Sequence, residues 1–189
     1  MEEKSVIVIM GMKHTGKSTV GSLLAQRLEA PFHDTDTVIS ELSGKTPRQL
    51  YDEGGSALMI ARETDAVRYL VNRYSGDKTG CVISTGGGLA DNAEALDLLK
   101  KAGTLVFLDT PFELLFKRVM VSAERDGRLP RFLQGGDPEA LFREVFLRRI
   151  KTYATMSDIR ITTGTRIPAE LVQEIMDRTA HEQRTNIHR

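Results

Sequence analysis

The chain has 189 residues, 40% of them hydrophobic, which is enough for one well-buried domain and too few for two ordinary ones. Lys plus Arg and Asp plus Glu number 26 each, so no overall charge favours a nucleic acid or an anionic membrane as partner. The one cysteine, Cys81, excludes an internal disulfide and is predicted to be a buried strand residue. No long apolar segment or cleavage signal is present, so we expect a cytoplasmic protein.

The first predicted element is a strand at residues 5–10, and a glycine-rich loop follows it directly. Residues 11–18 read Gly-Met-Lys-His-Thr-Gly-Lys-Ser, the GxxxxGK[ST] pattern of loops that wrap nucleotide phosphates. Its glycines allow backbone turns that aim successive N–H groups at an anion, and a helix predicted at 17–29 adds the positive end of its dipole. The alternative is a glycine turn that binds nothing. The residues predicted to contact ATP in this segment are Gly11, His14, Thr15, Gly16, Lys17, Ser18 and Thr19.

A short strand predicted at 31–33 leads into Asp34-Thr-Asp36, ahead of helices predicted within 37–74. Because parallel strands end at one edge of a sheet, both carboxylates are expected near the phosphate loop. One can serve Mg²⁺, and the other can accept a hydrogen bond from an acceptor hydroxyl and take its proton during phosphoryl transfer. The alternative for Asp36 is that it only caps the following helix. The helical region at about 34–74 is therefore assigned to acceptor binding.

Three glycines follow the next predicted strand, which spans 81–84. Gly86, Gly87 and Gly88 would let backbone N–H groups approach a bound substrate, although such a run is also common in simple turns. A helix at 91–101, a strand at 104–108 and a helix at 111–123 are predicted after them.

Residues 124–136 are rich in arginine and glycine and show neither helical nor strand periodicity. We predict that they form a mobile lid, because long loops in compact domains are usually functional; a surface loop without function is the alternative. A helix at 137–153, a strand at 158–162 and a helix at 167–183 complete the pattern.

This alternation predicts an α/β protein of the P-loop NTPase type: a three-layer α/β/α fold with a central five-stranded parallel sheet, formed by residues 1–189 as a single domain. A phosphate loop alone does not separate kinases from GTPases, motor ATPases or transporters. The sequence lacks the guanine-reading Asn-Lys-x-Asp and is short for a multi-module ATPase, so a small-molecule kinase is favoured.

Across nearly its whole length the sequence resembles the shikimate kinases. In the first half the phosphate loop, the Asp-Thr-Asp at 34–36, the Asp-Glu-x-Gly at 52–55, Glu63 and the Thr-Gly-Gly-Gly at 85–88 stand at the family's intervals. In the second half, residues 128–138 resemble the family's Arg-Pro-Leu-Leu lid, and Arg149 with Tyr153 resembles its Arg-x-Pro-x-Tyr helix end.

The resemblance implies transfer of the ATP γ-phosphate to the 3-hydroxyl of shikimate. On the nucleotide side it implies that Lys17 and Ser18 handle ATP and Mg²⁺ and that Asp34 holds a metal-bound water. A lid arginine, either Arg128 or Arg131, would neutralise charge on the transferring phosphoryl group. Two further residues lie at the family's adenine-side spacing, Arg166 and Pro168.

On the acceptor side the resemblance implies that Asp36 binds the hydroxyls, that the glycines at 86–88 contact the ring and that Arg149 binds the carboxylate. The family's arginine that clamps this carboxylate is replaced by Ile60. A charge-assisted hydrogen bond contributes about 1.5–3 kcal/mol, so its loss corresponds to roughly ten- to a hundredfold in shikimate affinity unless another cation substitutes. Arg62 lies about 200° around a helix from this position and is predicted to be a surface charge.

Three hypotheses follow. The first, which is favoured, is a shikimate kinase in which Arg149 and a lid arginine hold the carboxylate. The second is a kinase of the same type acting on a polyol or other small acceptor without a carboxylate, and the third is a nucleotide-binding protein without turnover. The expected partners are ATP and a small polyol or hydroxy acid, with Mg²⁺ as cofactor; we expect a monomer without nucleic-acid or membrane partners.

Overall fold

A parallel sheet forms the centre of the protein in the computed structural model, which describes residues 6–74 and 80–187. The strands are short and rich in β-branched residues that suit a buried sheet. They pair in the order β2-β3-β1-β4-β5, so the expected five-stranded parallel sheet is confirmed. Their bounds are β1 (Val6–Met10), β2 (Phe32–Asp34), β3 (Cys81–Ser84), β4 (Gly103–Asp109) and β5 (Ile159–Thr162).

Strand register brings the loops of interest to one edge of the sheet. Ser84 at the end of β3 pairs with Ile9 of β1 on one side and with Asp34 of β2 on the other. The segments that follow β1, β2 and β3 therefore leave the sheet side by side. This edge is where ligands bind in parallel α/β sheets.

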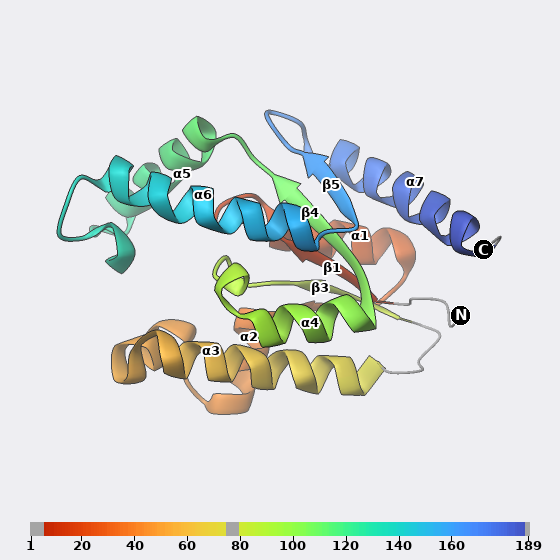
Figure 1. Ribbon diagram of the computed structural model, residues 1–189, viewed down its shortest axis with the longest axis horizontal. Coiled ribbons are helices and arrows are strands. Elements are labelled where there is room, and N and C mark those ends of the chain that lie inside the picture. Colours follow the sequence, from red (N-terminus) through yellow and green to blue (C-terminus); the bar gives the residue numbers. More distant parts are fainter. Residues whose placement is uncertain (1–5, 75–79, 188–189) are drawn as a thin grey trace.

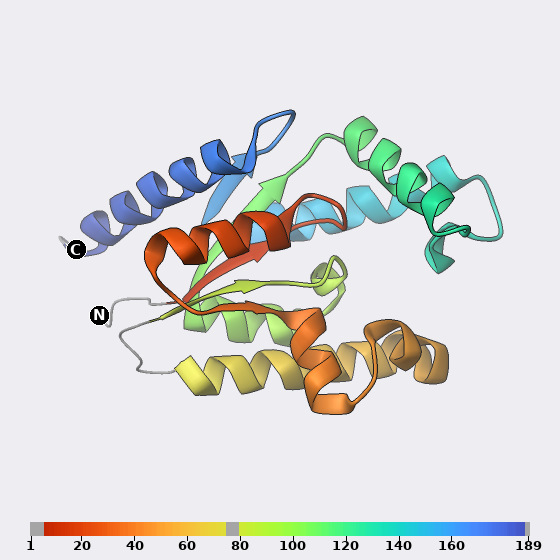
Figure 2. The same ribbon diagram turned by 180° about the vertical axis from the view of Figure 1, so that it is seen from behind.

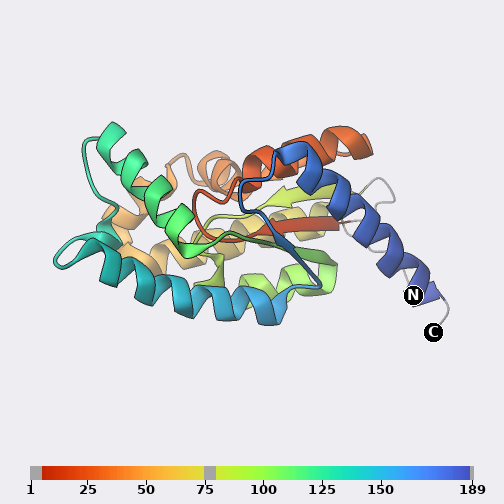
Figure 3. The same cartoon turned by 90° about the horizontal axis from the view of Figure 1, so that it is seen from above.

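Helices cover both faces of the sheet, as expected for three layers. One face packs against α1 (Lys17–Leu28) and α7 (Pro168–Ile187), which share an apolar cluster with the strands. The other face packs against α4 (Ala93–Ala102), α6 (Pro138–Met156) and α3 (Pro47–Tyr74). Figure 2 shows α1 in front of the sheet, and Figure 3 shows the two helical layers on opposite sides. None of the helices that the structure describes is long and apolar enough to cross a membrane.

The helical region after β2 begins earlier than expected and divides into two helices. Helix α2 (Thr35–Ser43) starts two residues before position 37, because the side chain of Asp34 accepts a hydrogen bond from the backbone N–H of Asp36 and caps it. The alternative in which Asp36 is the cap is therefore wrong. Helix α3 is interrupted at Gly55, whose φ of 64° and ψ of −156° lie outside the helical range.

The predicted lid segment contains more regular structure than its sequence indicated. Helix α5 (Phe112–Arg125) runs into it, and a short 3-10 helix, η2 (Arg131–Leu133), lies within it. The side chain of Leu133 is fully buried and anchors this turn to the core. In Figure 1 the lid and the start of α3 both lie on the side where the strands end. Another 3-10 helix, η1 (Leu89–Asp91), precedes α4, where a single helix at 91–101 was expected.

Candidate active site

The phosphate loop has the backbone conformation of an anion cradle. Gly11 and Gly16 have φ values of 149° and 92°, and His14 has a φ of 66°. A Cβ at Gly11 would lie 2.8 Å from the carbonyl oxygen of Leu108, so only glycine fits against β4 there. Gly16 caps α1 without any side-chain hydrogen bond, which leaves the first N–H groups of the helix available to phosphate oxygens.

Lys17 is held inside this loop. Its side chain is buried, and its Nζ donates a hydrogen bond to the carbonyl oxygen of Met12 at 2.8 Å. Burial lowers the pKa of Lys17 to about 8, although the carboxylates of Asp36 and Asp34 oppose the change. Bound phosphates would restore its full charge, so the site is arranged to receive an anion.

The Ser18 hydroxyl and the Asp34 carboxylate lie side by side at the end of the phosphate loop. The Ser18 Oγ donates a hydrogen bond to Asp34 Oδ2 at 2.7 Å, and Asp34 Oδ1 accepts one from the Asp36 N–H at 3.0 Å. Hydroxyl and carboxylate oxygens are ligands that Mg²⁺ prefers, usually one or two from the protein with phosphates and water supplying the rest. The described residues contain no cluster of three or more His, Cys, Asp or Glu side chains suited to a metal.

The glycine loop after β3 lies between α2 and the phosphate loop. The Gly86 N–H donates to Thr35 Oγ1 at 2.9 Å, and a Cβ at Gly86 would lie 2.9 Å from Asp36 Oδ1. A Cβ at Gly87 would lie 2.7 Å from the backbone nitrogen of Lys13. The two loops and Asp36 are therefore in contact, which brings the predicted nucleotide and acceptor residues together.

Asp36 faces this junction in a setting that suits a base. Burial raises its pKa, repulsion from Asp34 raises it further, and Lys17 and Lys13 oppose the change. A carboxylate with a raised pKa takes a proton more readily, as a group that accepts the proton of an attacking hydroxyl must do.

Glu63 is a second carboxyl at the acceptor side, and the sequence analysis did not count it among the site residues. It is buried on α3, accepts a hydrogen bond from Asn92 Nδ2 at 3.0 Å, and lies 3.2 Å from the position of a Gly86 Cβ. Burial raises its pKa to about 7, and the charges of Asp36 and Asp91 add to the rise. Its place in the family pattern was the only sequence signal for it.

Arg149 reaches the glycine loop, but its donors are already engaged. Its Nε and Nη2 donate to Asp91 Oδ2 at 3.0 and 2.8 Å, and its Nη1 donates to the carbonyl oxygen of Gly87 at 3.0 Å. The Tyr153 hydroxyl donates to the same carbonyl at 3.2 Å. Because Arg148 also pairs with Asp91, a fixed network supports the acceptor loop from α6.

Ile60 brings no positive charge to the site, and the nearby Arg62 of α3 does not supply the missing charge. The side chain of Ile60 is partly buried, and its carbonyl oxygen accepts a hydrogen bond from Asn92 Nδ2 at 3.1 Å. Arg62 is half exposed and pairs with Asp65 at 3.0 Å, which confirms that it is a surface charge.

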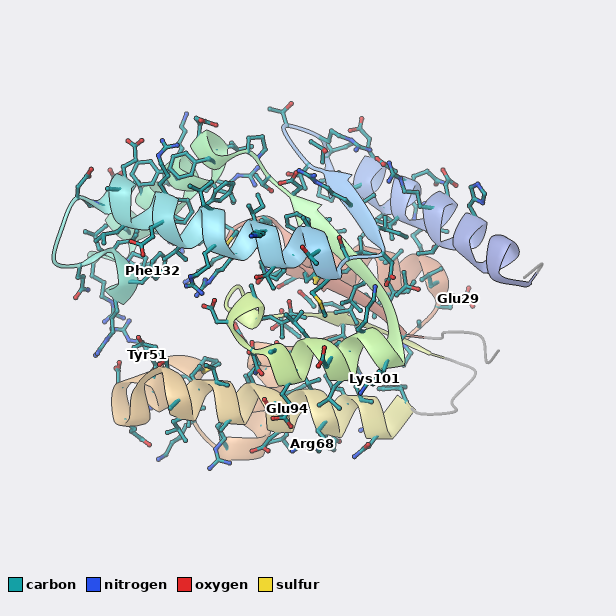
Figure 4. All side chains as sticks on the ribbon, in the orientation of Figure 1. Glu29, Tyr51, Arg68, Glu94, Lys101 and Phe132 are labelled. Carbon is teal, nitrogen blue, oxygen red and sulfur yellow. The ribbon has the colours of Figure 1, made fainter. Side chains whose placement is uncertain are left out.

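Of the two lid arginines, only Arg131 makes a described contact with the helical region assigned to the acceptor. Arg131 forms an ion pair with Asp52 of α3 at 2.7 Å, and Arg128 is exposed. Figure 4 shows Phe132 of the lid on the same side of the molecule as Tyr51 of α3. In the described contacts neither arginine touches the phosphate loop.

On the nucleotide side, the structure adds one residue that the sequence analysis missed. Arg118 of α5 donates a hydrogen bond from Nη1 to the carbonyl oxygen of His14 at 3.0 Å and so supports the phosphate loop. Arg166 follows β5 and pairs with Glu174 at 2.6 Å, just before Pro168 begins α7. Arg166 therefore lies at the edge of the sheet where β1 also ends, but its described ion pair is with a residue of α7 and not with the phosphate loop.

A phosphate loop at the end of β1, with a buried lysine and a carboxylate facing a second glycine loop, defines a P-loop phosphotransferase that acts on a hydroxyl acceptor. The family model described as shikimate kinase matches residues 13–180. A shikimate kinase of Aquifex aeolicus (strain VF5) is 37% identical over 170 residues, which cover 90% of this chain and 93% of that protein. One from Persephonella marina (strain DSM 14350 / EX-H1) is 36% identical over 172 residues, 91% and 97% of the two chains.

Solved structures agree with these sequence matches. The structure of shikimate kinase from Acinetobacter baumannii in complex with shikimate has a TM-score of 0.82 at 29% identity and covers 94% of each chain. The chain belongs to the shikimate kinase family.

Proposed function

We propose that the protein transfers the γ-phosphate of ATP to the 3-hydroxyl of shikimate. The observation that carries this proposal is the position of Asp36, which lies beside Gly86 at the contact between the acceptor loop and the phosphate loop. Membership of the family supports shikimate as the acceptor.

In the proposed reaction, Asp36 accepts a hydrogen bond from the acceptor hydroxyl and takes its proton as the oxygen attacks the γ-phosphorus. The new oxygen–phosphorus bond forms while the bond to the bridging oxygen breaks, and ADP leaves. Lys17 and the N–H groups of the phosphate loop bind the β- and γ-phosphates, and Arg118 holds the loop in shape. A lid arginine, Arg128 or Arg131, supplies positive charge when the lid closes.

Mg²⁺ fits the oxygen ligands at Ser18 and Asp34, and we propose that these two residues hold it with the ATP phosphates, Asp34 through a water molecule. The ion would neutralise charge on the β- and γ-phosphates. The interaction between the two side chains at 2.7 Å keeps both oxygens at the start of α1.

A second candidate function keeps the phosphoryl transfer and changes the acceptor to a polyol without a carboxylate. It is favoured by two observations: Ile60 brings no charge to the site, and Arg149 is already paired with Asp91. A protein that binds nucleotides without turnover would not need a carboxylate at Asp36, which argues against the third hypothesis.

The direct test is ADP release by the purified protein with MgATP, with and without millimolar shikimate, in the wild type and in Asp36→Asn. We expect shikimate to stimulate ADP release in the wild type only. Stimulation by polyols but not by shikimate would establish the second function, and ATP binding without any acceptor-dependent release would contradict both.

A further inference from the structure

Lys13 is the residue at which the phosphate loop meets the acceptor loop. A Cβ on Gly87 would lie 2.7 Å from the backbone nitrogen of Lys13 and 3.0 Å from its Cα, so the two backbones are already in close contact. On its other side Lys13 follows Met12, whose carbonyl oxygen binds the Lys17 Nζ at 2.8 Å. The backbone of Lys13 is therefore fixed between the lysine of the phosphate loop and the loop that contacts the acceptor.

The acceptor carboxylate lies beside the same glycine loop. Gly86 directly precedes Gly87, and a Cβ on Gly86 would lie 2.9 Å from Asp36 Oδ1. Lys13 therefore meets the glycine loop one residue away from the contact between that loop and Asp36, which places it close to the path of the transferring group.

Lys13 differs from Lys17, Arg149 and Arg131 because its side-chain amine has no partner in the described part of the chain. Its side chain is exposed and forms no hydrogen bond or ion pair within the part of the chain that the structure describes. Arg149 is bound to Asp91, and Arg131 of the lid is bound to Asp52. A lysine ammonium on its flexible stem carries three donors, and these remain available for a ligand.

We propose that Lys13 is a catalytic residue that contacts the transferring phosphoryl group as it passes from ATP to the acceptor bound beside Asp36. This inference rests on the proposed function and adds a residue to it. Lys13 forms no covalent bond: the hydroxyl proton goes to Asp36, ADP leaves, and the ammonium stabilises the charge on the phosphoryl oxygens between them.

The test compares Lys13→Met with Lys13→Arg, and with Lys101→Met as a matched control. Lys101 is an exposed lysine at the far end of α4, away from both loops (Figure 4). For Lys13→Met we expect kcat to fall about a hundredfold, the typical cost of removing one such donor, while the KM for acceptor and the Kd for ATP stay within about threefold. Lys13→Arg keeps the charge and is expected to retain most of the activity, and Lys101→Met all of it.

Three results would overturn the proposal. An unchanged kcat in Lys13→Met shows that the amine does not act in the transfer. A raised KM for acceptor with kcat retained makes Lys13 a binding residue for the acceptor instead. A loss of ATP affinity as large as the loss in kcat makes it a residue of nucleotide binding.

A second measurement separates this inference from the choice of acceptor. ADP with Mg²⁺ and aluminium fluoride mimics the transferring phosphoryl group and needs no shikimate, and its binding can be followed by calorimetry. If shikimate gives no turnover, weaker aluminium fluoride uptake in Lys13→Met with unchanged ADP affinity still supports the role of Lys13. Equal uptake in both proteins, or none in the wild type, would contradict it.

Discussion

Replacement of Glu63 by glutamine is expected to stabilise the protein at neutral pH and to have little effect in mild acid. The wild-type carboxyl is buried, with a pKa raised from 4.5 to about 7, chiefly by burial. Its neighbours Asp36 and Asp91 add to the rise, whereas Asn92 and Arg149 oppose it. In the unfolded chain the same carboxyl returns to its ordinary pKa, so it loses its proton at lower pH there than in the folded protein.

The direction in which stability changes with pH follows from the number of protons that the folded and unfolded states bind. Between pH 4.5 and pH 7 the folded protein binds the proton of Glu63 and the unfolded chain does not, so stability falls as pH rises through this window and the loss is complete above it. A shift from 4.5 to about 7, at about 1.36 kcal/mol per unit, corresponds to about 3 kcal/mol of unfolding free energy. Glutamine fills a similar volume, still accepts the hydrogen bond from Asn92, and does not ionise.

Urea unfolding at pH 5 and pH 8 measures this difference. The advantage of Glu63→Gln over the wild type is expected to grow by about 2–3 kcal/mol between the two pH values. Glu94→Gln is the control, because Glu94 is largely exposed in its ion pair with Arg68 and its effect should be the same at both pH values. An equal advantage, or none, for Glu63→Gln at the two pH values would refute the assignment of a raised pKa to Glu63.

Three further predictions follow from the loops and the lid. ATP binding requires the charged form of Lys17, and the pKa of Lys17 is about 8 in the free protein. The affinity for ATP should therefore fall above pH 8, by up to about tenfold per pH unit. The uptake of a proton on ATP binding should be visible by calorimetry in two buffers. Gly87→Ala should cost about 1–3 kcal/mol in thermal unfolding, since its Cβ meets the Lys13 backbone, whereas Gly88→Ala, with 3.7 Å to its nearest neighbour, should cost far less. Arg131→Ala should change the unfolding free energy by less than about 1 kcal/mol, because its ion pair to α3 is exposed; a larger loss would show that the lid contact is structural.

The fold and the phosphate loop were largely predictable because their signals are local. Runs of β-branched residues marked the strands, and GxxxxGKS fixed the start of α1. Boundaries were less accurate where one side chain decides them, as at Asp34, which caps α2 two residues before the expected start. The break in α3 depends on the backbone at Gly55, and the spacing of apolar residues does not encode it.

The contacts that complete the site join residues far apart in the chain. Glu63 meets Asn92, and Arg118 reaches the carbonyl of His14 across 104 positions, so no local pattern marks either pair. The pairing of Arg149 with Asp91 has the same origin, and it changes the interpretation of that arginine. The roles assigned to individual residues, the motion of the lid, the monomeric state and the cytoplasmic location stay predictions.

The most direct test of phosphoryl transfer to shikimate is identification of the product by ³¹P nuclear magnetic resonance, with Asp36→Asn as the control. With MgATP and shikimate, the wild type should convert the γ-phosphate signal into one phosphomonoester signal coupled to the proton at carbon 3, in equal amount to the ADP formed. Asp36→Asn should bind ATP and form no such product. Release of inorganic phosphate alone, or the same phosphomonoester from the variant at the wild-type rate, would contradict the account.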